Sequence, residues 1–245
     1  MNSALLTIDD FSSPNTPALV DYLKEKGITA IFFAVGQNVE AYYEEAIYAL
    51  KNGMIVGNHS YSHPAFSAIS LQECIGEIEK CNQVLDRLYR DSGVERTWRP
   101  FRFPYGDKGG ANKAALQQYF RENGFHKVDD THIPYPWWKE YSMDTDIDTF
   151  WTFDFEEYRL WQDPSFTRES IWQKMHNQNP EAGGVLFAPN NRHLILMHDF
   201  AETEKIMPGY YRVLIDHLLE NGLVFDKPRF LPAAEQIGNT RKEHL

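Results

Sequence analysis

The feature that most constrains the fold is the regular alternation of short apolar runs with segments of helical periodicity. The apolar runs read as strands and lie at residues 4–8, 28–36, 54–57, 100–104, 193–198 and 223–225. Between them, helical spacing and capping signals indicate helices at residues 16–26, 38–51, 71–88, 112–123 and 209–221. Strand–helix alternation along a whole chain predicts a mainly parallel sheet with helices outside it.

The chain has a length that suits one α/β domain. Its 245 residues can enclose one large core, and no composition shift marks a boundary, so we expect a single catalytic domain over residues 1–245. An irregular segment at about residues 126–163 interrupts the alternation and is rich in Trp, Tyr and Asp. A functional loop explains a segment of that length better than a helix or strand missed in the sequence, so we expect an aromatic-rich functional insertion there.

The charge balance limits the partners of the chain. A formal net charge of −11 argues against nucleic acid or an anionic membrane surface, because both need clustered Lys and Arg. A neutral or weakly cationic substrate fits better. The chain contains no apolar run of about 18 or more residues, so we expect no membrane span.

The sequence leaves the compartment and the oligomeric state open. The first ten residues lack a basic region followed by an apolar stretch. We therefore expect a cytoplasmic protein if Met1 is native, or an extracytoplasmic one if a leader was removed. Cys74 and Cys81 lie seven residues apart in an expected helix, too far apart to form a disulfide, so we expect two core thiols.

Polar clusters follow four of the expected strands, each at its carboxyl end. They are Asp9–Asp10, His59 with His63, Arg102 with Pro104–Tyr105, and His198–Asp199. Taken singly, each cluster has a structural explanation as a turn former, a surface ion pair or a buried histidine. In parallel α/β folds, however, this edge of the sheet is where catalytic residues from different strands converge. Four clusters on one edge therefore predict a functional site.

The residue types in these clusters suit metal-assisted hydrolysis. His59, His63 and one of the two aspartates make a three-ligand site for zinc or another divalent transition metal. The other aspartate would then act as a base on a water whose pKa the metal lowers to about 7. His198 could protonate the leaving group, and Arg102 could keep the free aspartate ionised through a two-pronged hydrogen bond.

Four ordered motifs resemble those of the polysaccharide deacetylases, the fourth carbohydrate esterase family. They are TIDD (7–10), HSYSH (59–63), RFPYG (102–106) and LMHD (196–199). The resemblance extends over roughly residues 5–225. It implies a single distorted (β/α) barrel of seven or eight mainly parallel strands with helices outside. It also implies a metal-dependent hydrolase that removes N-acetyl groups from oligo- or polysaccharide containing N-acetylglucosamine.

The resemblance also assigns roles to individual residues. Asp9 would be the catalytic base, oriented by Arg102, and His198 the general acid. The metal ligands would be Asp10, His59 and His63, holding most simply Zn²⁺, with Co²⁺ or Ni²⁺ as alternatives. The backbone N–H of Tyr105 would bind the oxyanion, and Leu196 would line the pocket for the acetyl methyl group.

Two departures from the family pattern affect these assignments. The first motif usually reads TFDDGP, whereas this chain has TIDDFSSPN, without the glycine–proline pair. The family's DxxDW motif has no literal copy, and its nearest equivalent is DFEEY at residues 154–158. Glu157 would then orient His198 and Tyr158 would replace a groove tryptophan. Asp154, Asp130 and Asp148 are the alternatives for orienting His198.

Aromatic residues crowd the insertion and suit a saccharide. They are Trp137, Trp138, Trp151, Tyr158 and Trp161. Their rings either belong to the core or stack on pyranose faces. We expect Trp151 and Tyr158 to bind substrate, together with Tyr105 and Leu196.

Three other functions compete with N-deacetylation. An allantoinase-like amidohydrolase of a small cyclic amide or ureide would use the same fold and site. A non-haem iron oxygenase also uses two histidines and one carboxylate, but it needs neither a second aspartate nor an acid histidine. An inactive carbohydrate-binding protein would have no need of Asp9 and His198.

Overall fold

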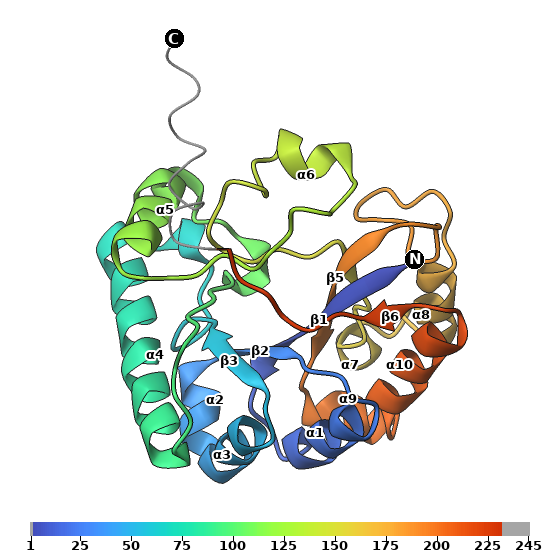
Figure 1. Cartoon of the computed structure of the whole chain (residues 1–245), viewed down its shortest axis with the longest axis horizontal. Coiled ribbons are helices and arrows are strands. Elements are labelled where there is room, and N and C mark those ends of the chain that lie inside the picture. Colours follow the sequence, from blue (N-terminus) through green and yellow to red (C-terminus); the bar gives the residue numbers. More distant parts are fainter. Residues whose placement is uncertain (1, 232–245) are drawn as a thin grey trace.

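The computed structural model describes residues 2–231 and shows strands surrounded by helices (Figure 1). The strands are β1 (Ser3–Phe11), β2 (Ile31–Ala34), β3 (Ile55–Asn58), β4 (Phe153–Asp154), β5 (Arg192–His198) and β6 (Val224–Phe225). The helices are α1 (Thr16–Glu25), α2 (Gly36–Ala41), α3 (Tyr43–Lys51), α4 (Leu71–Ser92), α5 (Lys113–Glu122), α6 (Pro136–Glu140), α7 (Arg159–Gln162), α8 (Arg168–Met175), α9 (Ala201–Ile206) and α10 (Tyr210–Glu220). Short 3-10 helices are η1 (Phe66–Ala68), η2 (Pro104–Gly106) and η3 (Gly110–Asn112).

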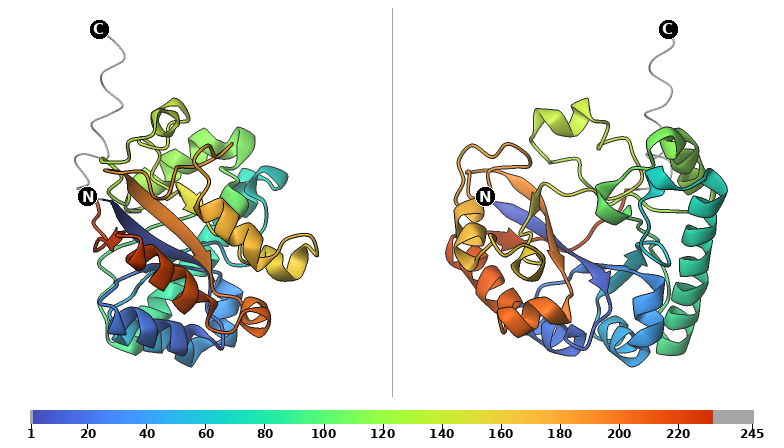
Figure 2. Two further views of the ribbon diagram at one scale, coloured as in Figure 1. Left: turned by 90° about the vertical axis from the view of Figure 1, so that its right-hand side faces the viewer. Right: turned by 180° about the vertical axis from the view of Figure 1, so that it is seen from behind.

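All the pairings between these strands are parallel. The order is β3-β2-β1-β5-β4, with β6 beside the start of β1. Helices α1 to α4 and α8 to α10 lie around the outside of the strands, as Figure 2 shows from two further sides. The expected barrel of mainly parallel strands with outer helices is confirmed. Within residues 2–231, six strands are assigned and the sheet is not closed by strand pairing.

The central strand β1 separates two packing layers by simple alternation of its side chains. Ala4, Leu6 and Ile8 pack in the large core with the outer helices. Leu5 joins a second cluster with Ile31, Phe33 and Leu194 of the adjacent strands, on the inner side of the sheet. Thr7 and Asp9 share the side of Leu5 by their spacing, so this inner layer becomes polar toward the carboxyl end of β1.

The predicted capping box at Ser70 is present and begins the longest helix, α4. Ser70 Oγ accepts from the backbone N–H of Glu73, and the Glu73 carboxylate accepts from the N–H of Ser70. Cys74 and Cys81 both lie in this helix as buried free thiols, as expected. A third hydrophobic cluster is mainly aromatic. It contains Phe101, Phe103 and Phe120 and packs between α4 and α5.

Two expected elements differ in the structure. The helix expected over residues 38–51 is divided at Tyr42, whose φ of −126° and ψ of 56° are not helical. The hydroxyl of Ser12 donates to the carbonyl oxygen of Tyr42 at 3.0 Å and compensates for this break. The strand expected at 100–104 is reduced to one parallel bridge between Phe101 and Asn58, because 3-10 helix η2 begins at Pro104.

The insertion was expected to be a loop, but it contains α6, β4 and α7, none of which is long enough to show a periodic pattern in the sequence. Strand β4 spans two residues and pairs with β5. Lys127 donates from Nζ to Asp130 and to the carbonyl oxygens of Met143 and Asp146, at 2.8 to 2.9 Å. The insertion is therefore an ordered part of the fold. The single-domain organisation remains a prediction.

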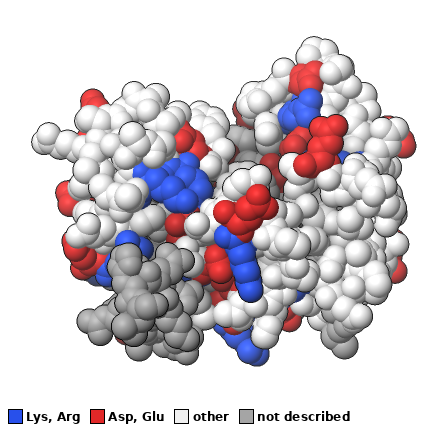
Figure 3. All heavy atoms as spheres, turned by 90° about the horizontal axis from the view of Figure 1, so that it is seen from above, with Lys and Arg blue, Asp and Glu red and all other residues white. Residues whose placement is uncertain are grey.

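The helices and one face of the surface were compared with the expectations on membrane spans and charge. No helix within residues 2–231 combines the length and apolarity needed to cross a membrane. On the face shown in Figure 3, Lys and Arg form small separate groups with Asp and Glu between them. The basic side chains visible on this face therefore do not form one continuous group.

Candidate active site

The end of β1 places two consecutive aspartates beside one cavity. Normal strand alternation would direct them to opposite faces. The register between β1 and β2 shifts between Ile8 and Phe11, and Asp10 has a left-handed φ of 60°. Such a bulge re-aims a side chain, and here it allows Asp9 and Asp10 to line the same cavity. The side-chain amide of Asn38 donates to the carbonyl oxygen of Asp10 at 2.8 Å and holds this conformation.

The loop after β3 positions the two histidines through its own hydrogen bonds. Asn58 Oδ1 accepts from the backbone N–H of Ser60 at 2.8 Å, and Ser60 Oγ accepts from that of His63 at 3.0 Å. Ser60 and His63 both have left-handed φ values, 68° and 62°. The resulting tight turn brings the rings of His59 and His63 to a centroid separation of 4.8 Å.

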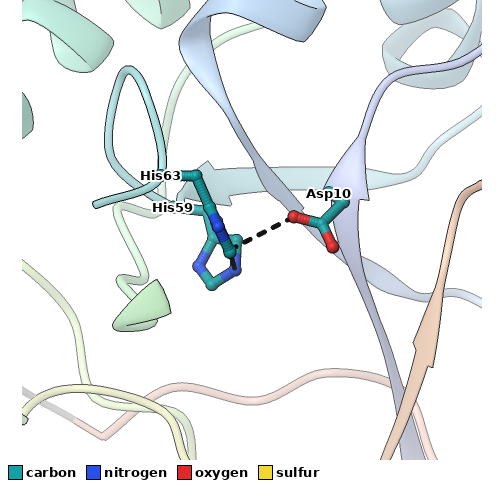
Figure 4. Close-up of side chains that lie close together, drawn as sticks. All are labelled: Asp10, His59 and His63. Atoms are coloured by element: carbon teal, nitrogen blue, oxygen red, sulfur yellow. Dashed lines mark hydrogen bonds and ion pairs between the residues drawn. The ribbon is translucent and has the colours of Figure 1, made fainter. Parts of the chain in front are cut away.

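Asp10, His59 and His63 converge as a candidate metal-binding group (Figure 4). His63 Nε2 lies 3.3 Å from Asp10 Oδ1 and 3.2 Å from His59 Nε2. His59 Nδ1 lies 2.8 Å from the carbonyl oxygen of Arg102. That oxygen can only accept, so Nδ1 carries the proton and Nε2 keeps its lone pair for a metal.

These three residues fit a divalent transition metal by chemistry and by placement. One atom from each lies within 4.8 Å of the others, and the set consists of two imidazoles and one carboxylate. Burial and the nearby His59 lower the pKa of His63 to about 4, so its ring is neutral at pH 7. Neutral imidazole is the form that binds metals.

Arg102 and Asp9 form a buried ion pair behind the ligands. Arg102 Nη1 donates to Asp9 Oδ1 at 2.7 Å, and the arginine side chain is fully buried. Burial favours a neutral Asp9, but Arg102, His59 and His198 together outweigh it, so the pKa of Asp9 is lowered. Asp9 Oδ2 also lies 3.5 Å from His59 Nε2, so the aspartate reaches the candidate metal site.

The expected two-pronged hydrogen bond from Arg102 to the aspartate is wrong. Only Nη1 reaches Asp9, and Nη1 also donates to Thr7 Oγ1 at 2.8 Å. Nε and Nη2 donate instead to the carbonyl oxygens of Thr149 and Phe150, at 3.1 and 3.2 Å. The fork of the guanidinium thereby joins the end of β1 to the insertion.

His198 lies beside Asp9 in register on β5 and has its own carboxylate partner. Glu157 Oε1 is 3.3 Å from His198 Nδ1 and also accepts the backbone N–H of His198, at 2.5 Å. Burial alone would lower the pKa of His198, but Glu157, with smaller contributions from Asp154 and Asp10, raises it to about 10. Glu157 therefore contacts His198, as expected for the residue that the sequence analysis assigned to orient this histidine.

The alternatives to Glu157 have different surroundings. Asp154 lines the cavity and belongs with Glu157 and His198 to a second candidate metal-binding group, and burial raises its pKa to about 6. Asp130 is bonded to Lys127 and to the indole N–H of Trp138. Asp148 accepts from Gln117 and pairs with Lys108. Asp130 and Asp148 therefore hold the insertion and do not contact His198.

One cavity of about 620 Å³ unites the site. Its lining includes Asp9, Asp10, His59, His63, Tyr105, Trp151, Asp154, Tyr158, Leu196 and His198. Arg102 and Glu157 lie behind it as buried partners. Every residue predicted for the site is therefore in the cavity wall or directly behind it. We call this space the catalytic cavity.

The aromatic residues of the insertion divide into two groups. Trp138 is buried, so the core interpretation holds for it. Trp151 and Tyr158 line the catalytic cavity, as expected for substrate-binding residues. Trp151 stacks on Phe150 at 4.2 Å, and Gly106 lies against it so closely that a Cβ there would come within 2.6 Å of the indole.

Several supporting residues escaped the sequence analysis. Asn38 was missed because its partner is a backbone carbonyl in another element. Asp199 accepts short hydrogen bonds from Ser13 and Thr16, which fix the segment that replaces the glycine–proline pair. The buried hydroxyl of Tyr210 donates to the carbonyl oxygen of His198. Only Asp199, the last residue of the LMHD motif, carried a sequence signal, and no role was assigned to it there.

Comparison with known proteins gives consistent matches. The family model described as polysaccharide deacetylase matches residues 1–128. The chain is 33% identical over 146 residues to the peptidoglycan-N-acetylmuramic acid deacetylase PdaC of Bacillus subtilis, covering 58% of this chain and 28% of the relative. It is 39% identical over 103 residues to chitin deacetylase 1 of Cryptococcus neoformans, covering 42% of this chain and 21% of the relative. The chain thus spans under a third of the length of these relatives.

Solved structures extend the similarity to most of the chain. The structure of PdaC from Bacillus subtilis superposes with a TM-score of 0.56 at 26% identity, covering 91% of this chain and 87% of that one. The polysaccharide deacetylase Bc1974 of Bacillus cereus superposes with a TM-score of 0.62 at 21% identity, over 91% and 90% of the two chains. The second likeness concerns the fold alone.

Proposed function

The chain belongs to the polysaccharide deacetylase family, and from this premise we propose that it removes acetyl groups from N-acetylglucosamine-containing oligo- or polysaccharide by metal-dependent hydrolysis. The observation that carries the proposal is the convergence of three units on one cavity. These are the Asp10–His59–His63 group, the Asp9–Arg102 pair and the His198–Glu157 pair. Relatives named as peptidoglycan and chitin deacetylases support the substrate class.

The ligands would be Asp10, His59 and His63, and Zn²⁺ is the proposed ion, with Co²⁺ or Ni²⁺ as alternatives. When bound, such an ion lowers the pKa of a water molecule and polarises a carbonyl group. Asp9, ionised because of Arg102, accepts a proton from the attacking water. The water oxygen forms a bond to the amide carbon of the substrate.

Collapse of the resulting oxyanion breaks the carbon–nitrogen bond. The backbone N–H of Tyr105, held at a φ of 60°, is proposed to stabilise the oxyanion. His198, protonated because of Glu157, gives its proton to the departing amine nitrogen. The products are acetate and a free amino sugar, and the proton held by Asp9 restores His198 through solvent. Leu196 lines the cavity as the proposed contact for the acetyl methyl group.

The test is acetate release from a panel of N-acetylated oligosaccharides, with allantoin included to detect ring-opening amidohydrolase activity. The protein is assayed after chelation and after reloading with Zn²⁺, Co²⁺ or Ni²⁺. We expect acetate only from the N-acetylated saccharides and only after reloading. Ureide hydrolysis without acetate release would replace the proposal with the amidohydrolase alternative.

A further inference from the structure

A second cavity of about 620 Å³ adjoins the catalytic cavity. Its lining comes from the insertion, from Lys174 of α8 and from the loop at residues 177–184. The two cavities share two lining residues, Trp151 and Asp154. They are therefore neighbouring compartments separated by one indole and one carboxylate. We call this second space the distal cavity.

The shared wall is held rigidly in place. Trp151 is stacked on Phe150 with an interplanar angle of 14°, and Gly106 leaves no room behind it. Asp154 lies in β4, and its Oδ1 accepts from the backbone N–H of Glu156 at 2.8 Å. A ligand that passes from one cavity to the other would therefore meet a preformed edge, which costs little ordering on binding.

The lining of the distal cavity combines aromatic faces with hydrogen-bonding groups. Trp137, Tyr141, Phe150 and Trp151 contribute rings, and Asn177 and Thr152 contribute polar side chains. Small-molecule sites have this composition and a volume of roughly 300–1,000 Å³. A pyranose unit can pack its C–H faces against the aromatic rings and form hydrogen bonds between its hydroxyls and the polar side chains.

The charges of the distal cavity select against anionic ligands. Three carboxylates line it, those of Asp154, Glu156 and Glu181, against the single ammonium of Lys174. That ammonium is already paired with Glu156. A carboxylate or phosphate on the ligand would meet net negative charge with no free cation to balance it, whereas an uncharged sugar would not.

From this continuity, lining and charge we infer that the distal cavity binds uncharged pyranose units of the same saccharide whose acetyl group is removed in the catalytic cavity. The inference rests on the proposed deacetylase function and specifies its substrate as a chain of several neutral sugars. Trp137 and Tyr141 are the residues that would bind the distal units, because neither lines the catalytic cavity.

The experiment measures kcat/KM for acetate release from N-acetylglucosamine oligomers of one to six units by the metal-loaded chain. For the unaltered chain we expect kcat/KM to rise with oligomer length. Trp137→Ala should lower kcat/KM for the long oligomers by about 2- to 10-fold, the loss of one aromatic stacking contact, while the shortest active oligomer is unaffected. Trp137→Phe, which keeps a ring, should retain most of the length dependence.

Trp98→Ala is the matched control, because Trp98 is an exposed tryptophan that lines neither cavity. It should leave the whole length series unchanged. Acetate release that does not depend on oligomer length, or an equal loss for all lengths in Trp137→Ala, overturns the distal site and leaves the deacetylase function intact. A chain that releases no acetate from any oligomer overturns both.

Binding gives a second readout. Titration of Asp9→Asn with the N-acetylglucosamine hexamer should change tryptophan fluorescence, and the added Trp137→Ala change should weaken that binding about 2- to 10-fold. An oligomer carrying carboxylate groups on its distal units should bind more weakly than the neutral hexamer. Equal binding of the charged and neutral oligomers would contradict the assignment of an uncharged ligand.

Discussion

Asp9 and His198 are register partners on the adjacent parallel strands β1 and β5, and each has a buried counter-ion of its own. Arg102 lowers the pKa of Asp9, whereas Glu157 raises that of His198 to about 10. At neutral pH one group is therefore ionised as a base and the other is protonated as an acid. Two neighbouring strand ends thus present the two protonation states that amide hydrolysis requires.

The first prediction concerns Asp9→Asn, which removes the proposed base without changing the shape of the side chain. We expect kcat to fall by about 10²- to 10⁴-fold, the usual contribution of general base catalysis. Metal content should be unchanged, because Asp10, His59 and His63 remain. The measurements are acetate release and metal stoichiometry by elemental analysis.

The control for this variant is Asp21→Asn, since Asp21 is exposed on α1 and lines no part of the catalytic cavity. It should retain full activity. If Asp9→Asn carries a full complement of metal and still turns over at the original rate, Asp9 is not the base.

The second prediction concerns Glu157→Gln, which removes the charge that holds a proton on His198. Because Glu157 contributes most to raising the pKa of His198, its loss must lower that pKa. The basic limb of the rate profile, where the acid loses its proton, should then move to lower pH by at least about one unit. The measurement is kcat against pH for the metal-loaded chain.

Two further variants serve as the control and the alternative for this second experiment. Glu169→Gln, an exposed change in α8, should leave the profile unchanged. A Glu157→Gln variant that is slower at every pH without any shift of its basic limb would show a structural role only. A shift produced by Asp154→Asn instead would transfer the role to Asp154.

The polar edge of the sheet could be predicted from the sequence because each functional cluster directly follows an apolar run. That pattern, together with the order of the motifs, located Asp10, His59 and His63, and the spacing of DFEEY located Glu157. Parallel strands bring such positions to one edge whatever the details of the helices.

Other features depend on contacts that leave no local signal. Strand β4 has only two residues, too few for alternation to be detected, and it exists because it pairs with β5. The bulge that lets Asp10 join Asp9 is stabilised by Asn38, 28 residues away. Arg102 was expected to donate two hydrogen bonds to one aspartate, but its Nε and Nη2 donate to carbonyl oxygens of the insertion. The sequence of the insertion has no periodic pattern from which its path could be predicted.

The third prediction concerns the metal itself. A ligand that binds only the folded chain stabilises it by RT ln(1 + [L]/Kd), about 2.7 kcal/mol at 100 times Kd. Adding Zn²⁺ to the chelated protein should therefore raise Tm, and His63→Ala should abolish most of the increase together with the bound metal. His132→Ala, an exposed change outside the catalytic cavity, should keep both. An equal rise in Tm for His63→Ala would place the ion elsewhere.

The last prediction concerns stability, and it depends on a histidine outside the catalytic cavity. His193 is fully buried in β5, with Nδ1 3.2 Å from Thr152 Oγ1 and Nε2 3.4 Å from the hydroxyl of Tyr135. Burial lowers its pKa to about 4 from the ordinary 6.5. Between these values the unfolded chain binds a proton that the folded chain does not, so stability must fall as pH falls.

From pH 7 to pH 5 this one group should remove about 2 kcal/mol from the free energy of unfolding. Other groups titrate in the same range, so the measurement is the difference in pH dependence between the unaltered chain and His193→Gln, by urea unfolding. His193→Gln should lose about that amount of the dependence even if it is less stable at pH 7, because glutamine cannot bind the proton. His132→Gln, an exposed histidine, should keep the original dependence. If all three chains lose stability in parallel between pH 7 and pH 5, His193 is not held neutral by its burial.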